Sequence, residues 1–201
     1  MDAPGAIRMW GLWTYPASER ADLLARPVRA ALEAARGTST WAQQARVAEI
    51  DPELADTASC CAAYGVPAEA SANCVVVVGK RGAQLSMAAC VVLATTRADV
   101  NGAVRGWLGA RKASFASQDD VLARSEMAYG GITPIGLPAQ WPILVDSAVL
   151  DQEHVILGSG IRGSKLVVPG AALEGLPGAE VRSGVARPIS TDSDASPGPV
   201  R

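Results

Sequence analysis

Two long apolar runs joined by a short glycine-containing segment dominate the middle of the chain. Residues 74–78 read Cys-Val-Val-Val-Val, residues 79–82 read Gly-Lys-Arg-Gly, and residues 85–95 form the second apolar run. Runs rich in β-branched residues and bounded by glycine are typical of strands, and two in succession favour a β-hairpin. We therefore expect a sheet built around this hairpin, with its turn at 79–82.

Helical patterns and shorter strand-like segments flank the hairpin on both sides. Helices are expected at 24–35, 52–64, 99–108 and 117–127, and near Pro169; strands are expected at 112–116, 143–146, 154–157 and 165–168. The helices rest on apolar spacing, on Ser or Asp caps and on glycine stops. Strands interleaved with short helices, with hairpin-like neighbours, predict a mixed α/β fold with a mixed sheet.

The length of 201 residues suits one domain with appendages. We expect an N-terminal extension with one helix over residues 1–50, a folded domain over 51–186 and a disordered tail over 187–201. The tail contains three prolines and a polar run with few groups to bury.

Composition excludes several classes of protein. No apolar run approaches the roughly 20 residues needed to span a bilayer, and the first twenty residues lack the pattern of a signal peptide, so a cytoplasmic protein without a membrane partner is expected. The four cysteines form no C-x-x-C pair and the chain has one histidine, which argues against structural zinc and against a disulfide scaffold. No metal site is expected.

Residues 158–163 fit the pattern G-x-G-x-x-G letter for letter. In a dinucleotide-binding fold this pattern must open a helix, but the segment that follows, 165–169, is strand-like. We therefore interpret it as a turn between strands, whose glycines let backbone amides approach a ligand.

Residues 130–136 read Gly-Gly-Ile-Thr-Pro-Ile-Gly. Such a loop exposes backbone amides and can act as an anion nest or an oxyanion hole, although on its own it is equally consistent with a tight connection.

Basic residues concentrate between residues 79 and 112, where six stand against one acid. This run is either a solvated face or a surface that meets phosphates.

Three segments in chain order resemble the YbaK/prolyl-tRNA-synthetase-associated domain family of aminoacyl-tRNA deacylases: residues 108–112, 130–136 and 158–165. The resemblance covers about residues 55–182. The family's central loop reads Gly-Gly-Ile-Ser-Pro-Leu-Gly, and only Thr133 and Ile135 differ from it. The resemblance implies a mixed α/β domain around a curved, mainly antiparallel sheet, here with a helical N-terminal extension.

The family's usual activity is hydrolysis of the ester between a wrong amino acid and tRNA, with no organic cofactor. The resemblance implies the tRNA acceptor end as partner, with an aminoacyl-tRNA synthetase as a further candidate; it leaves the oligomeric state open. Carried over residue by residue, it gives catalytic roles to Asn73, Gly130, Gly131, Ile132 and Thr133, and substrate contacts to Pro134, Gly136, Asp146, Ser159, Gly160, Arg162 and Lys165. Contacts to tRNA are expected from Lys80, Arg81, Arg111 and Lys112.

The chain departs from the family at two positions. The family opens its first strand with a lysine where this chain has Asn73, and a carboxylate found in some members falls at Lys165. Asn73 can donate a hydrogen bond but carries no charge, whereas Lys165 supplies a cation from the opposite side.

Three functions remain open from the sequence. The first is trans-editing hydrolysis of a small mischarged amino acid from tRNA. The second is a non-catalytic module that binds an aminoacyl, nucleotide or tRNA end. The third is an acyl-transfer enzyme that uses Cys74 as its nucleophile.

Overall fold

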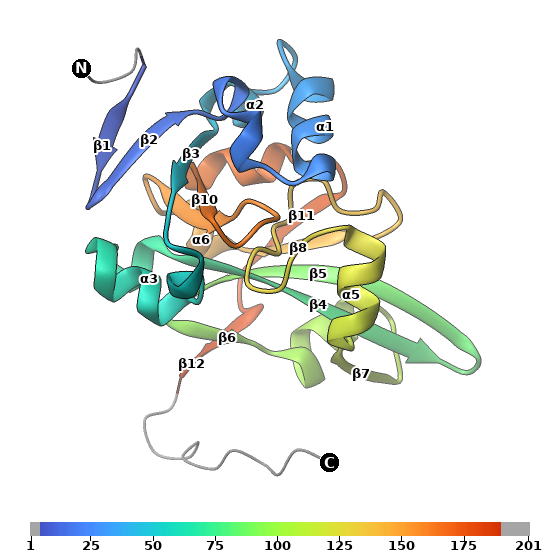
Figure 1. Cartoon of the computed structure of the whole chain (residues 1–201). Coiled ribbons are helices and arrows are strands. Elements are labelled where there is room, and N and C mark those ends of the chain that lie inside the picture. Colours follow the sequence, from blue (N-terminus) through green and yellow to red (C-terminus); the bar gives the residue numbers. More distant parts are fainter. Residues whose placement is uncertain (1–4, 190–201) are drawn as a thin grey trace.

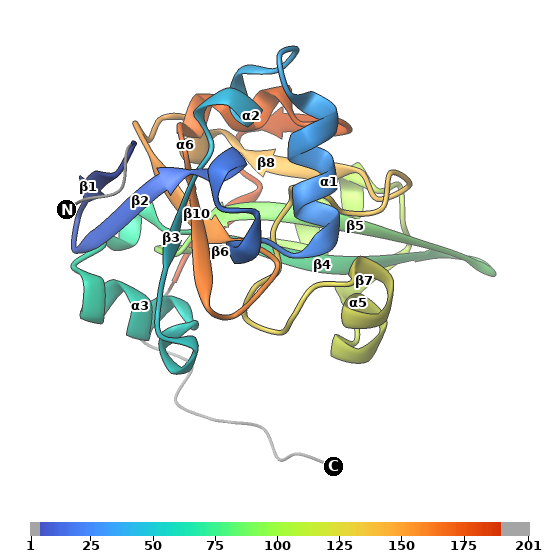
Figure 2. The same ribbon diagram turned by 45° about the horizontal axis from the view of Figure 1, so that its top comes forward.

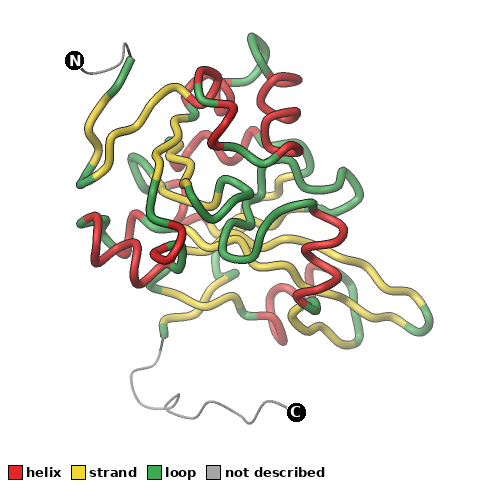
Figure 3. The backbone as a smooth tube through the Cα atoms, viewed as in Figure 1, coloured by secondary structure: helices red, strands yellow, loops and turns green. Residues whose placement is uncertain are grey.

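The computed structural model describes residues 5–189, which form two five-stranded sheets, a two-stranded ribbon and short helices (Figure 1). Figure 3 shows the strands at the centre and most helices at the periphery. The mixed α/β fold with antiparallel and mixed sheets confirms the predicted fold class.

The first sheet is antiparallel throughout, with the order β1-β2-β3-β10-β9. Its strands are β1 (Ile7–Met9), β2 (Leu12–Pro16), β3 (Arg46–Glu49), β10 (Ser164–Val168) and β9 (Val155–Gly158).

The second sheet is mixed, with the order β11-β8-β5-β4-β7. Its strands are β11 (Ala179–Arg182), β8 (Ile143–Asp146), β5 (Gln84–Leu93), β4 (Ala72–Arg81) and β7 (Lys112–Phe115). Strand β8 runs parallel to β5 and β11, and the other pairs are antiparallel. The ribbon pairs β6 (Thr96–Ala98) with β12 (Ala186–Pro188).

The helices are short. They are α1 (Arg26–Ala35), α2 (Thr40–Gln44), α3 (Thr57–Tyr64), α4 (Arg105–Trp107), α5 (Gln118–Ser125) and α6 (Ser147–Leu150), with a π-helical turn at Val100–Val104 before α4. Single 3₁₀ turns lie at Ala17–Glu19, Ala21–Leu23, Pro52–Leu54 and Ala68–Ala70, and a longer one, Gly170–Gly175, replaces the last predicted helix.

The predicted hairpin is confirmed, but its turn lies further along the chain. Strands β4 and β5 pair from Ala72 opposite Leu93 to Arg81 opposite Gln84. Gly82 has a φ of +64° and begins the turn, whereas Gly79 belongs to the strand. A side chain at Gly79 would meet Ala110 Cβ at 3.1 Å, so this glycine is explained by close packing and not by a turn.

The single helix predicted over 52–64 is wrong, because two caps divide it. Asp51 accepts a hydrogen bond from the Glu53 N–H and begins the 3₁₀ turn. Asp56 then accepts from the Ser59 N–H at 3.0 Å and begins α3. The helical path is therefore interrupted at Ala55 and Asp56, between the 3₁₀ turn and α3.

Residues 5–50 are more than a helical extension. The predicted helix is confirmed as α1, but β1, β2 and β3 also occur there and β3 pairs directly with β10. The boundary between residues 50 and 51 stays a prediction. Of the predicted disordered tail, residues 187 and 188 belong to β12, and residues 190–201 lie outside the described residues.

The main core lies between the two sheets. Leu166 of β10 and Val145 of β8 pack in one buried cluster with Val28 of α1 and Trp41 of α2. Figure 2 shows α1 and α2 at the top of the molecule, above strands β4 and β5. The sheets also join directly, because Ser71 bridges Ile156 of β9 just before β4 begins.

Removing the side chain of Leu166 should destabilise the fold strongly. Leu166 is 0% exposed, so Leu166→Ala should cost about 2–5 kcal/mol of unfolding free energy. Leu85→Ala makes the same change at a side chain that is 64% exposed and should cost less than about 0.5 kcal/mol. Urea unfolding measures both. Equal midpoints for the two variants would contradict this packing.

Candidate functional site

A cavity of about 370 Å³ lies where the two sheets meet. Its walls come from the start of β4, the end of β9, the start of β10, the residues that lead into α3 and the loop that ends at Ile132. Among the residues that line it are Asn73, Cys74, Gly130, Ile132, Gly158 and Lys165. The structure thus brings together residues from five separate parts of the sequence, including both glycine motifs.

The two glycine motifs pack backbone against backbone. The Gly160 N–H donates to the Gly131 carbonyl at 2.7 Å, and the Ala128 N–H donates to the Gly160 carbonyl at 2.8 Å. A Cβ atom at Gly158 would lie 2.2 Å from the Gly131 oxygen. Glycine is required here because any side chain would separate the two loops and open the cavity wall.

Only some backbone N–H groups of the glycine loop are free to bind a ligand. The Gly131 N–H donates to the Ala128 carbonyl at 3.0 Å, so this residue shapes the loop. Among residues 5–189, no acceptor takes the N–H of Gly130 or of Ile132, and both residues line the cavity. These two amides are available to an oxygen atom of a ligand.

The later part of the loop points away from this cavity. Thr133 is fully buried, and its hydroxyl has no hydrogen-bond partner among the described residues. Pro134 and Gly136 line a different, apolar pocket of about 400 Å³ beside α1. The structure therefore separates these three predicted site residues from Gly130 and Ile132.

Thr57 fixes the side chain of Asn73. The Thr57 hydroxyl donates to Asn73 Oδ1 at 2.7 Å, which leaves the amide NH₂ group of Asn73 as a hydrogen-bond donor in the cavity. Thr57 was not identified from the sequence. Its only local signal is its place as first residue of a helix, after the Asp56 cap.

Lys165 brings a buried amine to the same cavity. Its side chain is 8% exposed, and its Nζ donates to the Ala55 carbonyl at 2.6 Å. Burial lowers the pKa of Lys165, and the nearby Asp56 carboxylate is among the groups that oppose that shift. Ala55 lies between the 3₁₀ turn and the Asp56 cap of α3, so its carbonyl is free to hold this amine.

Arg162 does not line the cavity, but it contacts the backbone of Tyr129, which does. Arg162 donates to the Pro52 carbonyl at 2.8 Å and to the Tyr129 carbonyl at 3.4 Å, and so ties the glycine loop to the segment before α3. The side chain of Tyr129 is 60% exposed and lines the cavity. Arg162 thus braces the site through backbone carbonyls.

Ser159 and Gly160 form the turn and do not line the cavity. The Ser159 hydroxyl lies 2.6 Å from that of Ser164 in the interior, and a Cβ at Gly160 would come within 2.3 Å of Ala25. The Gly160 φ of +86° also favours glycine.

Asp146 anchors backbone segments. Its carboxylate accepts from the N–H groups of Ala148, Val185 and Ala186, each at 3.0 Å. These bonds begin α6 and hold the start of β12. Asp146 does not line the cavity, so the structure places it apart from the other predicted substrate contacts.

Cys74 lines the cavity, but its thiol is a weak acid. Burial raises the pKa of Cys74, and the neighbouring Cys90 adds to that shift. Burial likewise raises the pKa of Cys90 to about 12. The thiolate is the reactive form of cysteine, so neutral pH disfavours Cys74 as a nucleophile.

The predicted tRNA-binding residues cluster at the far end of β4. Lys80 pairs with Lys112 across β4 and β7, and the Arg111 N–H donates to the Lys80 carbonyl. Lys80 and Asn73 are separated by seven positions along one strand, which is about 23 Å at about 3.3 Å per residue. The basic cluster and the cavity are therefore two separate regions of the same sheet.

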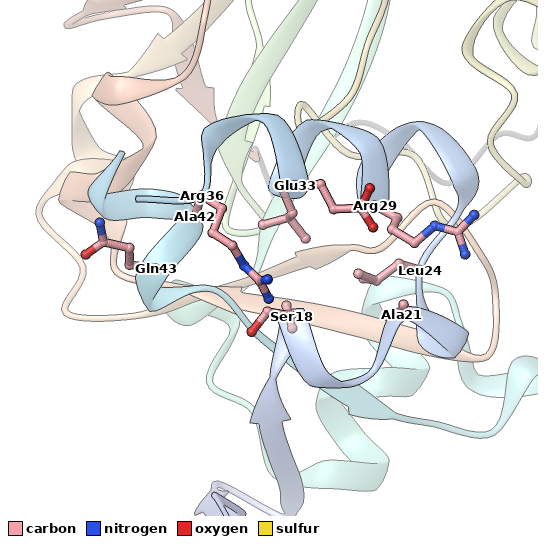
Figure 4. Close-up of a pocket in the computed structure, with 10 residues that line it drawn as sticks. Ser18, Ala21, Leu24, Arg29, Glu33, Arg36, Ala42 and Gln43 are labelled. Carbon is pink, nitrogen blue, oxygen red and sulfur yellow. The ribbon is translucent and has the colours of Figure 1, made fainter. Parts of the chain in front are cut away.

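A further pocket of about 390 Å³ lies in the N-terminal segment (Figure 4). Arg29 and Glu33 of α1 and Arg36, which follows it, line this pocket with mixed charge, and no predicted site residue lies there. Within the described residues, no group of His, Cys, Asp and Glu could hold a metal ion. The described helices are also too short or too polar to cross a membrane.

Gly131→Ala should damage the site through its backbone contacts. The new methyl would lie 2.6 Å from the Ile161 oxygen, which costs about 1–3 kcal/mol and lowers Tm by roughly 3–9 °C. Gly106→Ala is the matched control, because nothing lies within 4 Å of its Cβ position. Thermal unfolding measures both variants. A Tm for Gly131→Ala equal to that of the control would mean that the two loops are not packed together.

Comparisons with known proteins bear on the family and the fold. The family model described as an aminoacyl-tRNA editing domain matches residues 51–176. A crystal structure of "a putative trans-editing enzyme for prolyl tRNA synthetase" is 23% identical, with 79% of this chain and 94% of that chain covered and a TM-score of 0.65. The hypothetical protein APE2540 is 20% identical, with 81% and 100% covered and a TM-score of 0.68.

A search of curated proteins finds no match. The two structural likenesses lie under 25% identity and concern the fold, which is the mixed α/β fold described above. The family match spans more than half of the chain and confirms the resemblance seen in the glycine loops. The chain belongs to the aminoacyl-tRNA editing domain family.

Proposed function

We propose that this protein hydrolyses the ester between a small, wrongly attached amino acid and tRNA, acting in trans in the cytoplasm. The observation that carries the proposal is the convergence of three kinds of donor on one cavity. These are the fixed amide of Asn73, the free backbone N–H groups of Gly130 and Ile132, and the amine of Lys165.

The chemistry follows from these donors. Water attacks the ester carbonyl carbon, and the carbonyl oxygen becomes negative. Preorganised N–H donors stabilise such an oxyanion strongly where water is largely excluded. The bond to the ribose oxygen then breaks, and that oxygen receives a proton and leaves as a hydroxyl. Asn73 holds the ester, because Thr57 prevents its amide from turning.

The cavity favours a small amino acid. Its walls include Ala55, Ala72, Ile156 and Leu157, all uncharged, and its volume of about 370 Å³ must also hold part of the terminal ribose. Family membership supports tRNA as the carrier. A synthetase that releases the mischarged tRNA is the proposed further partner.

A non-catalytic binding module is the second candidate. The neutral Asn73 favours it, since the same donors would hold an aminoacyl end without hydrolysis. Acyl transfer through Cys74 is disfavoured by the raised pKa of its thiol.

A panel of mischarged tRNAs tests the proposal. Each tRNA is incubated with the protein, and loss of the acyl group is compared with the spontaneous rate. Accelerated loss for small amino acids supports hydrolysis. Saturable binding without accelerated loss for any tRNA would reject the hydrolase and select the binding module.

Asn73→Ala should lower turnover by about tenfold or more, because one positioned hydrogen bond contributes on the order of 1–2 kcal/mol. Asn101→Ala is the matched control, since Asn101 is exposed in the π-helical turn, outside the cavity. Cys74→Ser should retain most activity. A silent Asn73→Ala beside an inactive Cys74→Ser would instead assign a thiol nucleophile.

Affinity for tRNA should fall as salt rises, because the basic cluster displaces counterions from phosphates. Replacing both Arg111 and Lys112 by Gln should reduce the slope of log K against log salt by about 1–2. Arg29→Gln, in the N-terminal pocket, should leave the slope unchanged. Fluorescence titration from 50 to 200 mM salt makes the comparison. An equal slope for the wild type, the double variant and Arg29→Gln would mean that tRNA does not bind at the basic cluster.

A further inference from the structure

We propose that Lys165 is the catalytic cation of the cavity, and that its ammonium contacts the ester carbonyl oxygen and takes up the negative charge formed there. This proposal rests on the proposed hydrolysis. It assigns the positive charge of the site to β10, whereas the neutral Asn73 stands on β4.

The first argument is the cost of placing a lysine here. Buried ammonium groups are expensive unless they are paired. Lys165 is 8% exposed, yet among residues 5–189 it forms no ion pair with a carboxylate. Its hydrogen-bond partner is the neutral Ala55 carbonyl. Asp56 lines the same cavity and favours the ammonium without forming an ion pair with it, so no carboxylate of the described residues occupies the N–H donors of Lys165, and they can serve an anion that forms during turnover.

The second argument is geometry. An ammonium has three N–H donors, and the Ala55 carbonyl takes one, at 2.6 Å. Lys165 lies opposite Gly158 in the pairing of β10 with β9, and both residues line the cavity. The remaining donors of Lys165 therefore share this cavity with the free amide of Ile132.

The third argument concerns how the amine is held. A continuous helix over 52–64 would engage the Ala55 carbonyl in its own hydrogen bonds. The Asp56 cap interrupts the helix at that point, and the free carbonyl receives Lys165 from a strand 110 residues away. The break in the helix thus has a function in positioning Lys165.

The charged and titratable groups that act on Lys165 come from two segments. Asp56, Cys60 and Cys61 lie on α3 or at its cap and favour the ammonium, whereas Arg162 of the adjoining turn opposes it. Desolvation of the ammonium outweighs the groups that favour it, so the pKa of Lys165 is lowered. As pH rises, Lys165 therefore loses its positive charge at a lower pH than an ordinary lysine, whose pKa is about 10.4.

In the reaction, a water oxygen bonds to the carbonyl carbon while Lys165 donates a hydrogen bond to the oxyanion. The oxyanion then collapses, and the bond between that carbon and the ribose oxygen breaks. One proton of the water ends on the ribose hydroxyl, and the amino acid leaves as a free acid. Lys165 is unchanged after each turnover.

The test compares wild type, Lys165→Gln and Arg182→Gln on one mischarged tRNA under saturating conditions. Lys165→Gln should lower kcat by about 100-fold or more with little change in KM, since the oxyanion exists only after binding. Arg182→Gln removes an exposed charge on β11 and should match the wild type. The wild-type kcat, corrected for spontaneous hydrolysis, should fall at alkaline pH, and Lys165→Gln should lack that fall.

A relocated lysine separates catalysis from folding. Asn73 lines the same cavity. Adding Asn73→Lys to the Lys165→Gln variant should therefore raise its kcat at least tenfold. If wild type is active and Lys165→Gln stays within threefold of it, Lys165 is not catalytic and the hydrolase proposal survives. If Lys165→Gln is inactive, melts early and is not rescued, Lys165 is a structural residue. An inactive wild type overturns both proposals.

Discussion

The Gly131 carbonyl accepts a hydrogen bond from the Gly160 N–H at 2.7 Å, and this contact between two loops determines the shape of the site. It is possible only because glycines let the two backbones approach. One wall of the cavity depends on this contact, since Gly130, Ile132 and Gly158 belong to the joined loops. A small displacement here would move every backbone donor that the proposed reaction needs.

The opposite wall depends on the sheets. Strand β4 carries Asn73 and β10 carries Lys165, and the two sheets meet through the bridge between Ser71 and Ile156. Strand β3 pairs with β10 on the side away from the cavity, so residues from the N-terminal segment support a strand of the site. This support explains why the segment shares the main core although the family match begins at residue 51.

Local signals in the sequence predicted local structure well. The Ser117 cap, whose hydroxyl accepts from the Asp120 N–H at 3.2 Å, and the β4–β5 hairpin need only neighbouring residues and could be predicted. Strand β3 could not, because four residues gain their stability from pairing with β10 far along the chain. The glycine loops were recognised from their own motifs, and the family resemblance added Lys165 and the roles of the loops. Thr57 was not found, since its contact with Asn73 depends on tertiary packing.

The most direct measurement of the central claim uses a non-hydrolysable amide analogue of an aminoacyl-adenosine, titrated into ¹⁵N-labelled protein and followed by NMR. The claim that the cavity binds the aminoacyl end predicts saturable shifts in the amides of Gly130 and Ile132 and in the side-chain amide of Asn73. Ser18 and Arg29, in the N-terminal pocket, should not shift. Shifts confined to that pocket, with Gly130, Ile132 and Asn73 unchanged at saturation, would contradict the claim.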